Sequence, residues 1–162
     1  MFMTPDRISH EYWQTSPELP QDIFLAWQKP NKAFNPTAIV ATLDPDGAPH
    51  TAPFGSLRAV SQRTLRFATW RGHETYTNIC SDDRVEIFLL SPPGMAVSVR
   101  GRAKIKREIM EADPNYAVID VDIDMVKNDM VRRIVIQSAI TIHIPEEFVG
   151  WFEALLGELD AM

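Results

Sequence analysis

A cluster of polar side chains in the middle of the chain has the composition of an anion-binding site. It follows a β-branched and aromatic run and leads into the pattern of a short helix at 74–81. The cluster consists of Thr69, Arg71, Gly72, His73 and Thr75. Hydroxyls, a guanidinium and the free N–H groups at a helix N-terminus are well suited to hold an anion. The sequence therefore predicts a phosphate-binding site at this point.

The remaining reactive residues form no motif that spacing alone can identify. Cys80 is the single cysteine, which excludes an internal disulfide and a multi-cysteine metal site, and a lone cysteine is typically a packed side chain. The four histidines, at positions 10, 50, 73 and 143, never fall four residues apart, so no metal site is predicted. The spacing of Ser, His and Asp indicates no triad, and no catalytic residue is assigned.

Length and composition indicate one domain over residues 1–162. The chain has 45% hydrophobic and 23% charged residues, which is ordinary for a globular protein. A net charge of −6 argues against nonspecific nucleic-acid binding, which needs a basic face. No apolar run approaches the roughly 20 residues that span a bilayer, and the N-terminus lacks a signal-peptide pattern. We therefore expect a cytoplasmic protein with no nucleic-acid or membrane partner.

A hairpin is predicted ahead of the polar cluster. A β-branched run at 37–43 ends at Asp44-Pro45-Asp46-Gly47, where Pro and Gly favour a tight turn. The run from His50 to Val60 then returns as an antiparallel strand. Gly55 within this strand indicates either an edge irregularity or a close approach by a ligand or by another backbone segment.

The rest of the chain alternates between strand and helix patterns. An N-terminal arm is expected at 1–19, and further strands are expected at 64–69, 85–90, 96–106 and 131–144. Helices are expected at 20–28, 74–81 and 146–160, with a helical turn or two at 108–113, and 115–128 has no secure assignment. The strand 96–106 carries a basic stripe that we expect to be solvated, although its Arg100 end is within reach of an anion.

These elements predict a mainly β fold. Six strands are joined by short turns, with helices only in the connections and at the ends of the chain. This pattern is typical of a small six-stranded antiparallel β-barrel with short connecting helices and a C-terminal helix. The alternative is an open α+β sheet, whereas a Rossmann unit is excluded because β and α segments of the necessary length do not alternate.

Residues 37–107 resemble the flavin-binding split-barrel superfamily, which contains pyridoxamine 5'-phosphate oxidases, flavin reductase-like proteins and other FMN-binding relatives. The matching segments are Asp46-Gly47, Ala52-Pro53-Phe54-Gly55, Arg71 to Ile79, Asp83-Arg84-Val85 and Val99 to Ala103. The resemblance implies a split β-barrel that binds FMN and forms a homodimer with a flavin site shared between the subunits. The apolar surface of 131–144 and of the C-terminal helix is also more than one small barrel needs to bury.

One departure from the superfamily pattern lies at the phosphate position. Pyridoxamine 5'-phosphate oxidases carry a Ser-Arg-Lys cluster where this chain has His73-Glu74-Thr75, so the oxidase activity itself is not transferred. The spacing of Thr75 and Asn78 resembles the flavin reductase-like branch, in which a Thr at the helix start contacts the phosphate. In that case Arg71 and Arg58 would supply the positive charge.

The resemblance implies a set of cofactor-binding residues around the cluster. Backbone groups of 53–56 and 68–70 are expected to contact the flavin ring and the ribityl chain. The complete set is Pro53, Phe54, Gly55, Ser56, Arg58, Ala68, Thr69, Trp70, Arg71, His73, Thr75 and Asn78. Taken alone, Ser56, Thr69 and Trp70 are better explained by ordinary barrel polarity and packing, and only their position beside the cluster favours a functional role.

Three functions are compatible with these features. The first is an FMN-dependent oxidoreductase that acts on a small molecule or an electron donor. The second is the same fold with a deazaflavin, haem or no cofactor, which the missing cations favour. The third is a non-enzymatic dimeric module that binds a small ligand.

Overall fold

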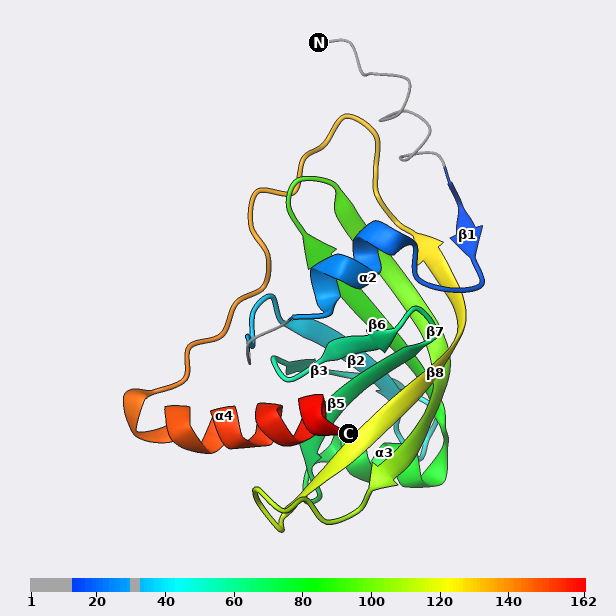
Figure 1. The fold of residues 1–162 in the computed structure, drawn as a ribbon. Coiled ribbons are helices and arrows are strands. Elements are labelled where there is room, and N and C mark those ends of the chain that lie inside the picture. The colour runs from blue at the N-terminus through cyan, green and yellow to red at the C-terminus, as the bar shows by residue number, and fades with distance from the viewer. Residues whose placement is uncertain (1–12, 30–32) are drawn as a thin grey trace.

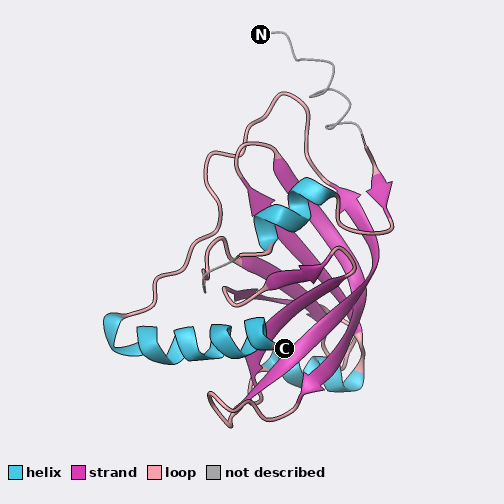
Figure 2. Ribbon diagram, in the orientation of Figure 1, coloured by secondary structure: helices cyan, strands magenta, loops and turns pink. Residues whose placement is uncertain are grey.

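The computed structural model describes residues 13–29 and 33–162 and shows one curved antiparallel sheet with helices packed against it (Figures 1 and 2). The strands are β1 (Thr15–Ser16), β2 (Ala38–Leu43), β3 (Pro49–Phe54), β4 (Arg58–Ser61), β5 (Thr64–Trp70), β6 (Arg84–Ser91), β7 (Met95–Arg107) and β8 (Tyr116–Asn128). The helices are α2 (Gln21–Trp27), α3 (Glu74–Ser81) and α4 (Glu146–Ala161). The strand order is β3-β2-β6-β7-β8-β5-β4, with β1 paired to β8.

The predicted fold class is confirmed, although the strand count differs. The described chain is mainly β, its strand pairs are antiparallel, and α2, α3 and α4 lie where helices were expected. Within the described residues, the sheet contains eight strands rather than six. One of the additional strands, β1, belongs to the predicted N-terminal arm, of which residues 1–12 lie outside the described part of the chain.

The predicted hairpin and its turn are confirmed in β2 and β3. Gly47 has a φ of +87°, a conformation that glycine adopts at little cost. The turn is closed by the N–H of Asp44, which donates to the carbonyl of Ala48 at 2.8 Å. In the resulting register Thr42 lies opposite His50, so the positions that follow β2 and begin β3 lie close together.

The predicted strand at 50–60 is wrong, because the chain leaves β3 at Phe54 and begins β4 at Arg58. The buried ammonium of Lys29 holds this corner by donating to the carbonyls of Gly55 at 2.9 Å and Leu57 at 2.6 Å. A Cβ on Gly55 would lie 2.3 Å from the side chain of Ile142. The glycine therefore marks the close approach of another segment of the chain.

The predicted strand at 131–144 is also wrong, since these residues form neither helix nor strand. They belong to a long connection that runs from β8 to α4 on the outside of the sheet (Figure 1). The connection is held by scattered bonds, such as that from the Thr37 N–H to the carbonyl of Ile140 at 2.7 Å. The last long strand of the sheet is instead β8, the segment without a sequence assignment, and it pairs with both β7 and β5.

The predicted helical turns at 108–113 are absent as well. This segment is a loop between β7 and β8, and a side chain of α4 supports its backbone. The carboxylate of Glu158 accepts hydrogen bonds from the N–H groups of Glu111 at 3.1 Å and Ala112 at 2.7 Å, and it pairs with Arg107. These bonds from the backbone and from Arg107 lower the pKa of Glu158 against the opposing effect of its burial.

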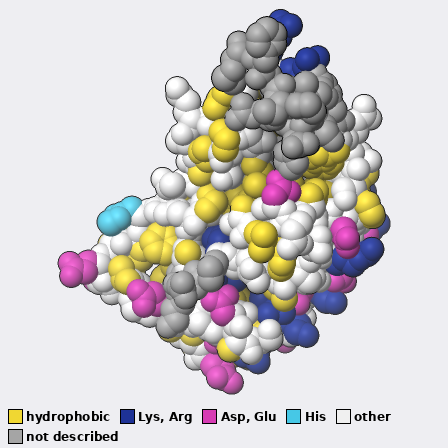
Figure 3. Space-filling view, turned by 45° about the horizontal axis from the view of Figure 1, so that its top comes forward, with side chains coloured by type: hydrophobic (Ala, Val, Ile, Leu, Met, Phe, Trp, Pro, Cys, Tyr) yellow, Lys and Arg dark blue, Asp and Glu magenta, His cyan; other side chains and the backbone are white. Residues whose placement is uncertain are grey.

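The basic stripe of β7 is a solvated face, as predicted, and acidic side chains accompany it. Arg102 lies 2.8 Å from Asp83, and Lys104 lies 3.2 Å from Asp122. Figure 3 shows Lys and Arg side chains gathered along one edge of the molecule with Asp and Glu among them. Exposed pairs of this kind contribute little to stability, and the stripe offers no concentrated positive charge for an anion.

The C-terminal helix α4 is attached to the sheet by a buried ion pair. Arg66 of β5 binds the carboxylate of Asp120 on β8 through two bonds, Nε to Oδ1 at 2.7 Å and Nη2 to Oδ2 at 3.0 Å. Its remaining Nη1 donates to the carbonyls of Leu159 and Met162 at the end of α4.

None of the helices in the described part of the chain combines the length and the hydrophobicity that a bilayer-spanning helix needs.

We predict that Asp120→Ala lowers the free energy of unfolding by about 3–5 kcal/mol, because it leaves the Arg66 guanidinium buried without its carboxylate. Asp122→Ala, on the same strand, removes an exposed partner of Lys104 and should cost at most about 1 kcal/mol. Urea denaturation of the two variants measures the difference. Equal, small losses would show that the buried pair does not stabilise the fold.

Candidate functional site

A glycine and a histidine shape the turn between β5 and α3. Gly72 lies against the indole of Trp70, and a Cβ at this position would lie 2.5 Å from the ring. His73 is the N-cap of α3, and its Nδ1 accepts a hydrogen bond from the N–H of Thr75 at 3.1 Å. The cap satisfies one of the N–H groups that the first turn of a helix leaves unpaired. The cap of this helix is therefore His73 and not Thr75.

Two buried polar side chains lie on the inner face of α3. Asn78, 3% exposed, donates from Nδ2 to Thr42 Oγ1 at 3.0 Å and to Asp44 Oδ1 at 2.9 Å, which ties the helix to the β2–β3 hairpin. Thr75 is 0% exposed, and its hydroxyl has no hydrogen-bond partner among the described residues. A buried hydroxyl without a partner is costly. Thr75 is therefore a polar group in the first helical turn that the protein itself does not satisfy.

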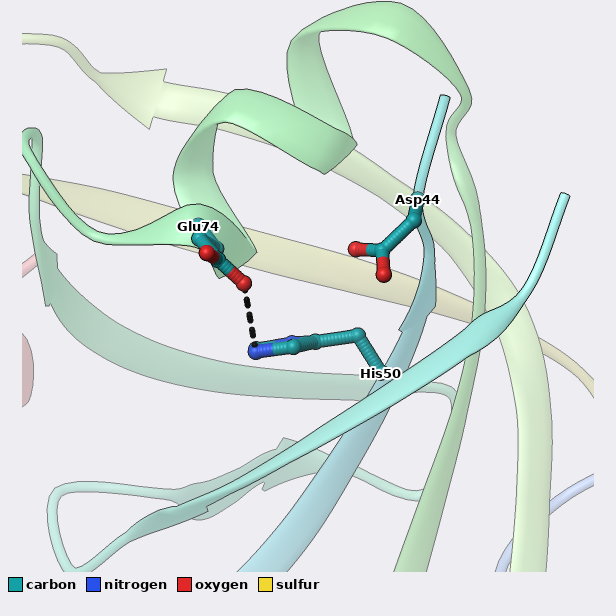
Figure 4. Close-up of side chains that lie close together, drawn as sticks. All are labelled: Asp44, His50 and Glu74. Atoms are coloured by element: carbon teal, nitrogen blue, oxygen red, sulfur yellow. Dashed lines mark ion pairs between the residues drawn. The ribbon is translucent and has the colours of Figure 1, made fainter. Parts of the chain in front are cut away.

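Side chains of the hairpin meet the start of α3 (Figure 4). The Nε2 of His50 lies 3.0 Å from a carboxylate oxygen of Glu74, and the carboxylate of Asp44 lies beside them. The ring of His73 packs edge-on against the rings of His50 and Phe54, with centroid distances of 6.1 and 5.8 Å. The site thus combines side chains from the end of β2, from β3 and from α3.

The structure brings together only some of the residues predicted to bind the cofactor. Phe54, His73, Thr75 and Asn78 lie at the site described above. The sequence did not indicate Asp44, His50 or Glu74 as site residues. The predicted hairpin could have indicated that Asp44 and His50 lie close together, because it brings the end of β2 and the start of β3 together. Nothing local in the sequence indicated that α3 would lie against them.

Most of the other predicted residues make contacts within the protein. The hydroxyl of Ser56 accepts a hydrogen bond from the N–H of Ala68 at 3.0 Å and is buried with it. Thr69 is buried, and its hydroxyl donates to the carbonyl of Trp70. Gly55 is covered by Ile142, whereas Pro53 on β3 is exposed.

The two predicted arginines have partners of their own. Arg58 is 2% exposed and pairs with Asp160 of α4 at 2.9 Å, with further bonds to the carbonyls of Lys29 and Ala33. Burial lowers the pKa of Arg58 against the opposing effect of Asp160. Arg71 donates to the carbonyl of Glu108 at 2.9 Å. The guanidinium of Arg58 is therefore paired with Asp160, and that of Arg71 is bonded to the β7–β8 loop.

Trp70 borders a second candidate site. Its side chain is 52% exposed and lines an open hollow of about 530 Å³. The lining residues are Trp70, Asp113, Asn115, Tyr116, Phe148 and Trp151. Within it, the indole N–H of Trp151 donates to Asp113 at 2.9 Å. The volume is within the range of small-molecule sites, and the walls are aromatic.

A comparison with protein families identifies one matching model. Residues 31–128 match the family described as pyridoxamine 5'-phosphate oxidase. The match includes β2 to β8, and with them the hairpin and α3. A search of curated proteins found no match.

Solved structures with the same fold include three that are described by different functions. A candidate pyridoxamine 5'-phosphate oxidase from Lactobacillus delbrueckii has 23% identity and a TM-score of 0.56, with coverage of 70% of this chain and 98% of that one. An F420 reductase has 16% identity, a TM-score of 0.51 and coverage of 68% and 100%. An FMN-binding protein from Syntrophomonas wolfei has 14% identity, a TM-score of 0.50 and coverage of 66% and 88%. At these identities the likeness concerns the fold.

The assignment of the cap predicts different effects on stability for two substitutions at the start of α3. His73→Ala removes the acceptor of the Thr75 N–H and should lower the free energy of unfolding by about 1 kcal/mol, within the range of other N-caps. Thr75→Val removes a hydroxyl that has no partner and should be close to neutral without ligand. Thermal unfolding of the ligand-free variants compares them. A loss confined to Thr75→Val would assign the capping role to Thr75.

Proposed function

The chain belongs to the pyridoxamine 5'-phosphate oxidase family, and on this basis we propose that it is an FMN-dependent oxidoreductase acting on a small molecule or an electron donor. In such an enzyme the flavin ring supplies the hydride or electron chemistry, and the protein supplies binding, orientation and exclusion of water. This division of labour is consistent with a chain in which spacing indicates no triad. The observation that carries the proposal is the unpartnered, buried hydroxyl of Thr75 in the first turn of α3.

In this proposal the phosphate of FMN binds at the start of α3. The N-terminal end of a helix carries a partial positive charge, and Thr75 would donate its hydroxyl to a phosphate oxygen. Because that hydroxyl is buried, binding requires a small movement of the atoms that cover it. We propose that the exposed residues Pro53 and Trp70 contact the flavin ring and the ribityl chain.

The charge at this site favours a second candidate cofactor. The side chains nearest to the start of α3 include the carboxylates of Glu74 and Asp44, while Arg58 and Arg71 are bonded elsewhere. A site without arginine or lysine holds a phosphate weakly. The alternative proposal is therefore a deazaflavin, haem or no redox cofactor in the same fold, with a non-enzymatic ligand-binding module as the third possibility.

We also propose that the protein is a homodimer. Exposed apolar side chains are concentrated in the connection before α4, where Val131 and Val135 are 59% and 69% exposed. Phe148, at the start of α4, is half exposed and borders the aromatic hollow. A second copy that covered the connection would bury an interface of the kind found in stable dimers, and one that also covered the start of α4 would close the hollow.

The proposed phosphate contact predicts a specific loss of affinity in Thr75→Val. A hydrogen bond to a charged phosphate contributes about 1.5–3 kcal/mol, so FMN should bind about 10- to 100-fold more weakly. Thr77→Val is the matched control, because Thr77 lies on the same helix and is exposed, and its affinity should equal that of the unmodified protein. Quenching of flavin fluorescence measures both constants. An unchanged constant in Thr75→Val would remove the phosphate from this helix.

The dimer proposal predicts that light scattering finds twice the mass of one chain at micromolar concentration. Val135→Glu should shift the protein toward monomers, because it places a charge on the proposed interface. Ile105→Glu, at an exposed apolar position on β7, is the control and should leave the dimer intact. A monomeric unmodified protein would refute the proposal.

A further inference from the structure

We infer that Asp44, His50 and Glu74 form a binding site for one divalent first-row transition-metal ion beside the start of α3 (Figure 4). The sequence predicts no metal site, because the three residues come from different elements and show no ligand spacing. Asp44 follows β2, His50 lies in β3, and Glu74 is the first residue of α3. The fold brings them to one place.

The geometry of the three side chains is close to that of a metal-ligand set. One ligand atom from each residue lies within 4.8 Å of the other two. Ligands bound to one ion at about 2.1 Å are about 3.4 Å apart in a tetrahedral site. The pair formed by His50 Nε2 and Glu74 is already at 3.0 Å. A rotation of the exposed Glu74 side chain would bring its carboxylate toward an ion shared with His50 and Asp44.

A buried hydrogen bond orients one of the carboxylates. Asn78 Nδ2 donates to Asp44 Oδ1 at 2.9 Å and, at the same time, to Thr42 Oγ1. Outer hydrogen bonds of this kind fix the ligands of metal sites. Asp44 is further restrained by its N–H, which closes the hairpin turn by donating to Ala48. The carboxylate is therefore held in position before any ion binds.

The imidazole of His50 points into the same cluster. In the described structure its one polar contact is the approach of Nε2 to Glu74, since the buried Nδ1 has no hydrogen-bond partner. Nε2 is a common metal ligand in proteins. The ring is partly shielded, with a side-chain exposure of 23%, whereas Glu74 is 73% exposed. An ion can therefore reach the cluster from the solvent on the Glu74 side.

The charge of the cluster favours a cation. Two carboxylates converge here, and in the described part of the chain no Lys or Arg forms an ion pair with Asp44 or Glu74. A divalent ion would neutralise both charges at once. One imidazole nitrogen with carboxylate oxygens suits Zn²⁺ and Mn²⁺, and solvent would complete the coordination shell.

The metal site also bears on the proposed function, and this part of the inference rests on that proposal. Two uncompensated carboxylates beside the start of α3 would repel the phosphate of FMN. A bound divalent ion would remove the repulsion and supply positive charge where Glu74 replaces a cationic residue of the resembling oxidases. We therefore expect FMN to bind more tightly to the metal-loaded protein than to the protein without metal.

Titration calorimetry of the full-length, tag-free protein with ZnCl₂ and with MnCl₂, in the absence of flavin, tests the metal site. We expect one ion per chain, and at least a tenfold weaker affinity in both His50→Gln and Glu74→Gln, because the loss of a hydrogen-bond partner of a metal ligand alone costs about 10- to 100-fold. His143→Gln and Glu86→Gln, an exposed histidine and a half-buried carboxylate outside the cluster, are the matched controls and should bind as the unmodified protein does. Circular dichroism confirms that each variant is folded.

Two results would overturn the inference. One is the absence of binding to the unmodified protein at millimolar metal, and the other is equal affinity in the cluster variants and the controls. A second titration, of FMN with Mn²⁺ or with EDTA, separates this inference from the proposed function. Metal binding without FMN binding supports the metal site and refutes the flavin proposal. FMN binding to a protein that binds no metal supports the flavin proposal and refutes the metal site.

Discussion

The buried ion pair between Arg66 and Asp120 is the interaction on which the rest of the fold depends. Neither side chain could be buried alone, because an uncompensated charge inside the protein is costly. Together they join β5 to β8 at a point where the sheet is covered by α4. The Nη1 of Arg66 also donates a hydrogen bond to the carbonyl of Leu159 near the end of that helix. Since β5 leads directly into α3, its position sets the position of the candidate site.

The backbone and the side chains of the candidate site favour ligands of opposite charge. Its backbone is suited to an anion, because α3 begins there and Thr75 offers an unused hydroxyl. Its side chains are suited to a cation, because Asp44 and Glu74 converge on His50. A phosphate ester and a divalent ion bound next to each other satisfy both groups of atoms. A single ligand of either charge would leave one group uncompensated.

Local signals in the sequence predicted local structure, and partners far along the chain did not follow from them. The turn at Gly47 and the helix α3 depend on adjacent residues, and both are confirmed. The alternating isoleucines of 131–144 indicate a face but not a neighbouring strand, so that prediction failed. β8 was not predicted as a strand, because its buried Asp120 is compensated by Arg66, which lies 54 positions away in the sequence. For the same reason Arg58 could not be recognised as the partner of Asp160, and α3 could not be placed against the hairpin.

A comparison of the affinities for FMN and for riboflavin, which lacks only the phosphate, tests the phosphate site at α3 most directly. Both dissociation constants are measured with Mn²⁺ present. FMN should bind at least about tenfold more tightly, because a charge-assisted contact contributes 1.5 kcal/mol or more, and the advantage should be smaller in Thr75→Val. Equal affinities in the unmodified protein would contradict a phosphate site at the start of α3.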